Sequence, residues 1–166
     1  SRFGITGTDL GVPFEHGGRT FVLFGDTWHG SFSGDNDDLD AIAVVEGGTP
    51  DEGLRLDFRR EPPRVPGISQ AGFEVPLDGV SWAGSIYGFF STDHYVAQGT
   101  DLMGRAVVAR SDDDGHTFTY LYDLPRSHFI NVSTSIADGE AHGLPAGPQL
   151  VMFGSARYRS SDIYLA

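Results

Sequence analysis

Two aspartates, Asp9 and Asp26, flank a Gly17-Gly18 pair, and this spacing is the main chemical signal in the sequence. A Gly-Gly pair is typical of the two-residue turn that closes a β-hairpin. A hairpin closed there pairs His16 with Arg19, and the same register places Asp9 opposite Asp26. Two facing carboxylates repel, so one tends to keep its proton while the other stays ionised. Such a pair supplies the acid and the base or nucleophile of glycoside hydrolysis.

The same residues also allow a purely structural interpretation of the two aspartates. Each carboxylate could cap its own turn, and a bulge near Pro13 could shift the register of the hairpin, because proline cannot donate to a strand ladder. In that case Asp9 and Asp26 would not face one another.

Aromatic and polar residues follow the second aspartate and recur later in the chain. Trp28 and His29 come directly after the strand that carries Asp26, and Asp93 and His94 follow a similar strand. Aromatic faces stack on sugar rings, although a tryptophan is equally suited to filling a core. We therefore predict these four residues to bind substrate.

Several neighbouring residues have weaker roles in this prediction. Trp82 and Tyr95 are expected to cluster with Asp93, Trp82 more as core than as a sugar platform. Glu74 and Asp78 are possible third carboxylates, for which we expect surface positions.

The elements that must position these residues are strands, because 23 glycines and nine prolines punctuate apolar or alternating runs and helical periodicity is nearly absent. We predict strands at Thr20–Phe24, Ala41–Val45, Ser85–Phe90, Arg105–Ala109, Thr117–Tyr122, Gln149–Phe153 and Asp162–Leu165.

Three of the predicted strands look alike and indicate a repeat. Aligned on Phe24, Phe90 and Phe153, they recur after 66 and then 63 residues, each followed by a loop and another apolar strand. Repeated antiparallel sheets are typical of β-propeller blades. We predict an all-β, five-bladed-type β-propeller that is incomplete, with about two and a half blades at 1–66, 67–125 and 126–166. A β-sandwich is the alternative.

The segment Ser111–Phe118 has the Ser-x-Asp-x-Gly-x-Thr-aromatic form of an Asp box, a hairpin signature found in propellers. The Asp and Ser/Thr side chains can hydrogen-bond the turn backbone, and Gly115 can adopt a positive φ. We expect this segment to be structural.

Charge and composition exclude several classes of function. The chain has 166 residues, a net charge of -12 and no lysine or cysteine, so we expect neither nucleic acid nor membrane as a partner. The acidic run Asp35–Asp40 lacks the glycine and glutamate of a calcium loop, and we expect no metal and no cofactor. The chain begins at Ser1 without a signal peptide, which fits an upstream segment that has been removed.

Four motifs together resemble the endo-D-arabinanase family of glycoside hydrolases: Gly-Thr-Asp-Leu-Gly, Phe-Gly-Asp-Thr-Trp, the Asp box, and Phe-Gly-Ser-Ala-Arg-Tyr-Arg-Ser-Ser near the end. The resemblance implies a secreted five-bladed propeller that cleaves α-D-arabinofuranosyl linkages in mycobacterial arabinogalactan and lipoarabinomannan. It implies catalytic roles for Asp9 and Asp26 and places the Tyr-Arg-x-Ser motif at Tyr158, Arg159 and Ser161. Arg159 would either hold the polysaccharide substrate or fix a loop.

The resemblance would cover about the first half of a complete domain, so the missing blades would come from the rest of a longer chain. A non-catalytic carbohydrate-binding propeller is the main alternative function. A sialidase-like enzyme is a weaker alternative, because it needs an arginine cluster and a nucleophilic tyrosine that the sequence does not place.

Overall fold

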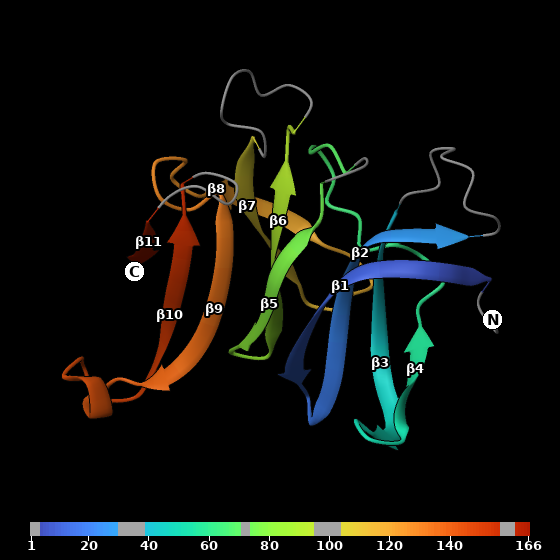
Figure 1. Cartoon of the computed structure of the whole chain (residues 1–166). Coiled ribbons are helices and arrows are strands. Elements are labelled where there is room, and N and C mark those ends of the chain that lie inside the picture. Colours follow the sequence, from blue (N-terminus) through green and yellow to red (C-terminus); the bar gives the residue numbers. More distant parts are fainter. Residues whose placement is uncertain (1–3, 30–38, 71–73, 95–103, 157–161) are drawn as a thin grey trace.

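A computed structural model describes residues 4–29, 39–70, 74–94, 104–156 and 162–166, and the regular secondary structure of these ranges is almost wholly β-strand (Figure 1). A short 3-10 turn, η1, spans Glu140–His142. Within the described ranges there is no helix long and apolar enough to cross a membrane.

The strands form three antiparallel sheets in chain order. The first sheet contains β1 (Ile5–His16), β2 (Arg19–His29), β3 (Leu39–Thr49) and β4 (Gly53–Phe58). The second contains β5 (Pro76–Trp82), β6 (Ser85–Thr92), β7 (Arg105–Ser111) and β8 (Thr119–Asp123). The third contains β9 (Asn131–Asp138), β10 (Pro148–Ser155) and β11 (Ile163–Leu165), with β10 in the middle.

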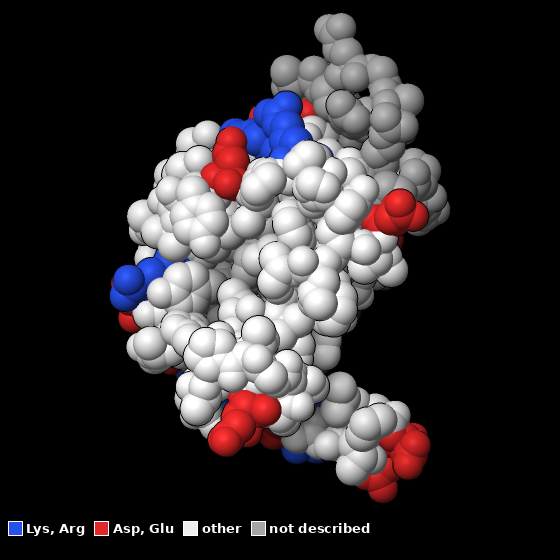
Figure 2. All heavy atoms as spheres, turned by 90° about the vertical axis from the view of Figure 1, so that its left-hand side faces the viewer, with Lys and Arg blue, Asp and Glu red and all other residues white. Residues whose placement is uncertain are grey.

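The first strands of the three sheets lie next to one another. β1 packs against β5, and β5 packs against β9, so the sheets follow one another side by side with these strands innermost (Figure 1). The space-filling view, turned by 90°, shows that the molecule is hollowed along one side (Figure 2). Sheets of consecutive strands with the first strand innermost are blades, and the described part of the chain is an incomplete, propeller-like all-β fold.

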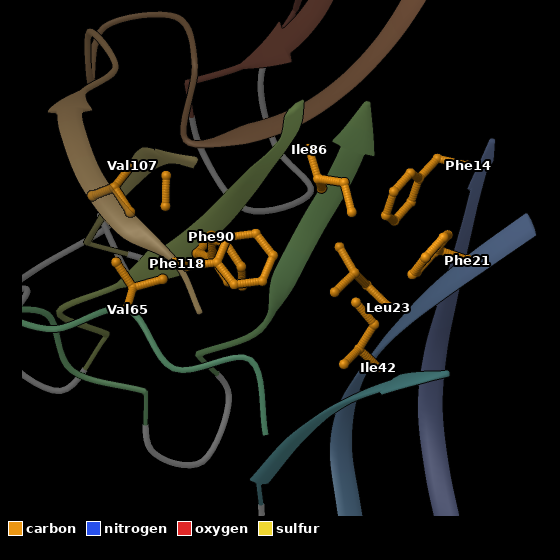
Figure 3. Packing of buried hydrophobic residues seen from close by; sticks show 10 residues of the cluster. Phe14, Phe21, Leu23, Ile42, Val65, Ile86, Phe90, Val107 and Phe118 are labelled. Carbon is orange, nitrogen blue, oxygen red and sulfur yellow. The ribbon is translucent and has the colours of Figure 1, made fainter. Parts of the chain in front are cut away.

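Alternating side chains on each sheet build the cores between the sheets. Phe21 and Leu23 of β2 point toward the second sheet, where they meet Ile86, Phe90 and other buried residues (Figure 3). The opposite face of the second sheet packs on the third through Phe89 and Val108.

The predicted hairpin turn is confirmed. Gly17 and Gly18 have φ values of 58° and 73°, the left-handed conformation that both central residues of this turn require. The turn joins β1 to β2 with His16 opposite Arg19, as the sequence predicts.

All seven predicted strands coincide with or overlap strands of the structure, and β1 is the first arm of the predicted hairpin. The strands β4, β5 and β9 were not predicted. The three sheets span 5–58, 76–123 and 131–165, and each lies within one of the three predicted ranges. The arrangement is not the β-sandwich alternative, in which two sheets would form one shared core.

Candidate functional site

Asp9 and Asp26 lie at the same end of the first sheet. We call it the upper end: in each sheet the first and third strands begin there and the second strand ends there (Figure 1). Asp9 is near the start of β1, and Asp26 is near the end of β2. The structure therefore brings the two aspartates close together in the hairpin.

The predicted register is wrong at the aspartates themselves. The ladder runs in the expected register from His16↔Arg19 to Val12↔Leu23, but Asp9 then pairs with Gly25 and not with Asp26. The shift does not lie at Pro13, which pairs with Val22 as expected. The shift lies at Leu10 and Gly11, because these two residues of β1 together face a single residue of β2.

A second bulge follows on the other strand. Between the pairs Asp9↔Gly25 and Gly7↔Trp28, β2 has two residues, Asp26 and Thr27, where β1 has one. Bulges of this kind re-aim side chains and are common next to active sites. One bulge on each strand thus brackets the Asp9↔Gly25 pair.

The bulges contain unusual backbone conformations. Leu10 has a φ of 58° and Asp26 has a φ of 39°. Both values lie in the left-handed region, which residues other than glycine rarely adopt. Strained residues persist only where the surrounding structure holds them, and they concentrate at functional sites. The strain at Asp26 coincides with a predicted catalytic residue.

Hydrogen bonds hold the backbone around Asp26. The Thr27 hydroxyl is fully buried and donates to the Gly25 carbonyl at 3.3 Å. The Thr8 hydroxyl of β1 lies 3.0 Å from the Thr27 hydroxyl, so it links the two strands across the bulge. On the other strand, the Asp9 carboxylate accepts the Leu10 amide at 2.6 Å and remains exposed.

Trp28 is half-buried, and its ring covers Gly7 of β1. A methyl group at Gly7 would lie 3.3 Å from the Trp28 Cε3 atom, so the glycine makes room for the indole. The covered face packs on the strand, while part of the ring stays accessible. His29, the last residue of β2, is exposed.

Asp93 and His94 follow β6 at the upper end of the second sheet, and other side chains fix their positions. Arg105 of β7 donates from Nε to the Asp93 carboxylate at 2.6 Å and also contacts Asp123. Burial opposes the charge of Arg105, yet the hydrogen bonds and charges of these two aspartates outweigh it and raise the pKa of the guanidinium. The His94 amide donates to the Glu74 carboxylate at 2.8 Å.

Several neighbouring residues lie elsewhere than expected. Trp82 ends β5 at the end of the sheet opposite Asp93, so the two do not cluster. Glu74 and Asp78 are buried, with exposed fractions of 3% and 7%, and are not at the surface. Arg159, with Tyr158 and Ser161, and Tyr95 lie outside the described residues.

The roles of Arg105 and Glu74 were missed in the sequence. Arg105 is the first residue of a mainly apolar strand and Glu74 precedes a proline-containing segment, so neither has a local pattern that marks it. Their partners are distant in sequence, since Glu74 meets His94 across 20 residues and Arg105 meets Asp93 across 12.

The Asp box is the structural turn that its sequence predicts. The Asp113 carboxylate accepts hydrogen bonds from the Thr117 amide and hydroxyl and from Ser111. Burial alone would raise the pKa of Asp113, but these bonds prevail and lower it to about 2. The Gly115 backbone approaches Ile42, so the turn also packs on the first sheet.

In the part of the chain that the structure describes, no three His, Asp or Glu side chains come together in a way that could hold a metal ion. Most of the acidic run Asp35–Asp40 lies outside that part. Asp40 itself is buried, and its carboxylate accepts a hydrogen bond from the side-chain amide of Gln70 at 3.0 Å.

The fold and this end of it define an all-β protein of incomplete propeller-like architecture whose first hairpin carries one aspartate in a bulge and one between its two bulges. The chain belongs to the DUF4185 family, described as a domain of unknown function, whose model matches residues 1–166. No curated protein matches the sequence significantly.

Proposed function

We propose that this chain forms the catalytic portion of a secreted glycoside hydrolase that cleaves α-D-arabinofuranosyl linkages in a cell-wall polysaccharide. The observation that carries the proposal is that Asp9 pairs with Gly25 and Asp26 directly follows Gly25, with one bulge on each side of this pair. The resemblance of the motifs around both aspartates to endo-D-arabinanases supplies the substrate class.

In the proposed reaction, one carboxyl group protonates the glycosidic oxygen as the bond to the anomeric carbon breaks. The other, as carboxylate, either attacks the anomeric carbon or removes a proton from the water that attacks it. When the carboxylate attacks, water later displaces it, and the first residue takes a proton back from that water. Either route consumes one water. The route through attack by the carboxylate returns both carboxyl groups to their starting protonation states, whereas the direct attack of water leaves the proton on the second carboxyl group, and exchange with solvent restores the starting state.

The residues around the pair fit the binding of a furanoside chain. The partly accessible ring of Trp28 offers a surface for a sugar ring, and His29 is exposed beside it. Asp93 and His94 would bind hydroxyl groups one sheet further along, as would Arg159, whose position lies outside the described residues.

Replacement of each aspartate by asparagine tests the proposal. Asp9→Asn and Asp26→Asn should each reduce the release of reducing ends from D-arabinan by about a hundredfold or more, because an amide can neither donate the proton nor accept it. Asp51→Asn, in the exposed turn between β3 and β4, is the matched control and should retain activity. Full activity in both Asp9→Asn and Asp26→Asn would exclude the proposed mechanism.

The stereochemistry of the product reports the separation of the two carboxyl groups during catalysis. NMR of the first product anomer distinguishes retention, which requires a separation of about 5 Å, from inversion, which requires about 6.5 to 9.5 Å. Binding of D-arabinan without any product would instead select the non-catalytic carbohydrate-binding propeller.

The third sheet offers a reason to expect further blades. Phe153, Ile163 and Leu165 are 45%, 78% and 68% exposed, and the side of the molecule at this sheet is largely uncharged (Figure 2). Apolar residues on a sheet face are normally covered by the next layer. We infer that additional blades of a longer chain cover this face and complete the substrate groove.

A further inference from the structure

Glu74 is a buried carboxylate beside the candidate site. It lies two residues before β5, at the upper end of the second sheet, and only 3% of it is exposed. Glutamate is almost never so buried unless its charge is paired or hydrogen-bonded. Its position therefore requires an explanation in the residues that it contacts.

Contacts between the sheets place Glu74 near the two aspartates. The next residue, Val75, packs against Gly25: a methyl group at Gly25 would lie 2.5 Å from the Val75 Cγ1 atom and 3.2 Å from the Leu10 Cδ1 atom. Gly25 precedes Asp26 and Leu10 follows Asp9. Val75 is thus in contact with Gly25, the neighbour of Asp26, and Leu10, the neighbour of Asp9, packs against the same glycine.

The Glu74 carboxylate holds the turn that follows β6. It accepts the His94 amide at 2.8 Å, and the preceding residue, Asp93, has a φ of 63°. Arg105 holds the Asp93 side chain from the other side at 2.6 Å. The Asp93–His94 turn is therefore fixed through both its backbone and its side chain.

The pairing of β5 with β6 does not depend on Glu74. The Ser91 amide donates to the Val75 carbonyl at 2.9 Å, and the Val75 amide donates to the Ser91 hydroxyl at 2.8 Å. These bonds already join the two strands at this point. The contact of Glu74 with His94 extends beyond the ladder, to the two residues that the sequence predicts to bind substrate.

We propose that Glu74 is a positioning residue that holds the Asp93–His94 turn in the orientation that binds the furanoside chain. The inference rests on the proposed function, because it assigns to Glu74 the geometry of the substrate-binding part of that same site. Glu74 acts through the backbone of His94 and does not itself touch the reacting atoms.

Two substitutions test whether the hydrogen bond to His94 is what matters. Glu74→Ala removes the acceptor and should raise KM for D-arabinan about tenfold, with kcat changed less than about threefold. Glu74→Gln keeps an acceptor oxygen at the same place and should restore KM to within about threefold of the wild-type value. Slower hydrogen exchange of the His94 amide in Glu74→Gln than in Glu74→Ala should accompany the rescue.

Asp78→Asn is the matched control. Asp78, in β5, is also a buried carboxylate of the second sheet, but it accepts hydrogen bonds from Gly79 and from Thr134 of the third sheet. This variant should lower stability and leave KM unchanged. If Glu74→Ala does not fold, Glu74→Asp, which is one methylene shorter, takes its place.

The outcomes separate this inference from the proposed function. An active wild type with an unchanged KM in Glu74→Ala would overturn the role of Glu74 alone. A KM for D-arabinan that rises as much in Glu74→Gln as in Glu74→Ala would also overturn the role of Glu74. The negative charge of Glu74, and not its hydrogen bond to the His94 amide, would then be what substrate binding requires. A wild type that neither cleaves nor binds D-arabinan would overturn both proposals.

Discussion

Gly25 and Val75 join the first two sheets at a contact with no room for a side chain on the glycine. A methyl group at Gly25 would lie 2.5 Å from the Val75 Cγ1 atom, well inside van der Waals distance. The φ of Gly25 is not in the positive region, so the glycine is required for space and not for conformation. The contact fixes the bulged part of the hairpin to the second sheet.

Gly25→Ala should therefore lower the free energy of unfolding by about 1 to 3 kcal/mol, the usual cost of overpacking. In the double variant Gly25→Ala/Val75→Ala, the smaller partner should make room and recover part of the loss. Chemical denaturation of the two single variants and the double variant measures the coupling. Strictly additive effects would show that the two side chains do not meet.

The left-handed backbone conformation of Asp26 should lower the stability of the fold, and this effect can be measured separately from the proposed catalytic role of its carboxyl group. Glycine adopts this conformation without strain, so Asp26→Gly should be about 0.5 to 1 kcal/mol more stable to unfolding than Asp26→Ala. Both variants should lose activity on D-arabinan. An Asp26→Ala variant as stable as Asp26→Gly would contradict the strained backbone.

The Asp box should make stability depend on pH in the acid range. The folded pKa of Asp113 is lowered from its usual 3.8 to about 2, so its contribution is present above pH 3.8 and is lost as the pH falls toward 2. The difference in unfolding free energy between wild type and Asp113→Asn should be constant from neutral pH to about 4.5 and then shrink. For Asp51→Asn, in an exposed turn, the difference in unfolding free energy from the wild type should not shrink in this way as the pH falls.

His16 connects the two sheets at the end opposite the aspartates. Its Nδ1 atom lies 2.7 Å from the Ser81 hydroxyl, and its Nε2 atom lies 3.2 Å from the Asp114 carboxylate, which also accepts Arg19 at 2.6 Å. The ring is 8% exposed and packs edge-on against Phe21. It thus ties the first hairpin to both β5 and the Asp box.

His16→Ala should cost about 1 to 3 kcal/mol of unfolding free energy, because Ser81 and Asp114 lose a buried partner. The kinetic constants for D-arabinan should stay within about twofold of the wild type, since His16 lies far along β1 from Asp9. His142→Ala, on the exposed turn η1, is the control and should change neither property. A His16→Ala variant with the stability of the wild type and a raised KM for D-arabinan would contradict the structural role of His16.

Strands with strong local patterns could be predicted from the sequence, and strands that depend on other sheets could not. β2, β3, β6 and β7 consist largely of apolar residues bounded by turn residues. β5 contains Pro76, Asp78 and Gly79, which normally interrupt strands, and β9 is mostly polar. Both are held by neighbouring sheets: the Asp78 carboxylate, for example, accepts the Thr134 amide.

The candidate site could be predicted only in part, for the same physical reason. The Gly17-Gly18 turn set the register correctly as far as Val12↔Leu23. The ladder then shifts at Leu10, a residue type that gives no sign of a left-handed conformation in the sequence. A one-residue shift changes which side chains face each other, so the predicted Asp9–Asp26 pair became Asp9–Gly25.

The Phe24–Phe90–Phe153 repeat shows the same sensitivity to a shift of one residue. Phe24 and Phe90 lie on corresponding faces of their sheets, away from the sheet that follows. Met152 packs on the second sheet, so its neighbour Phe153 points to the opposite face of β10. The repeat identified the correct strands and matched β2 with β6, but it aligned β10 one residue out of step.

The tight turns Gly17-Gly18 and Ala83-Gly84 both lie at the extremity of the molecule remote from Asp9, and a side chain added at Gly17, Gly18 or Gly84 would meet no atom within 4 Å. Their positive φ still favours glycine, so the exposed Asp51, in the β3–β4 turn at the same end, is the suitable attachment point for a fluorophore, an affinity tag or a surface linker. A protein immobilised through Asp51 would present its upper end to an insoluble glycan without obstruction. The attachment point and the surface that would contact a cell wall therefore lie at opposite ends of the molecule.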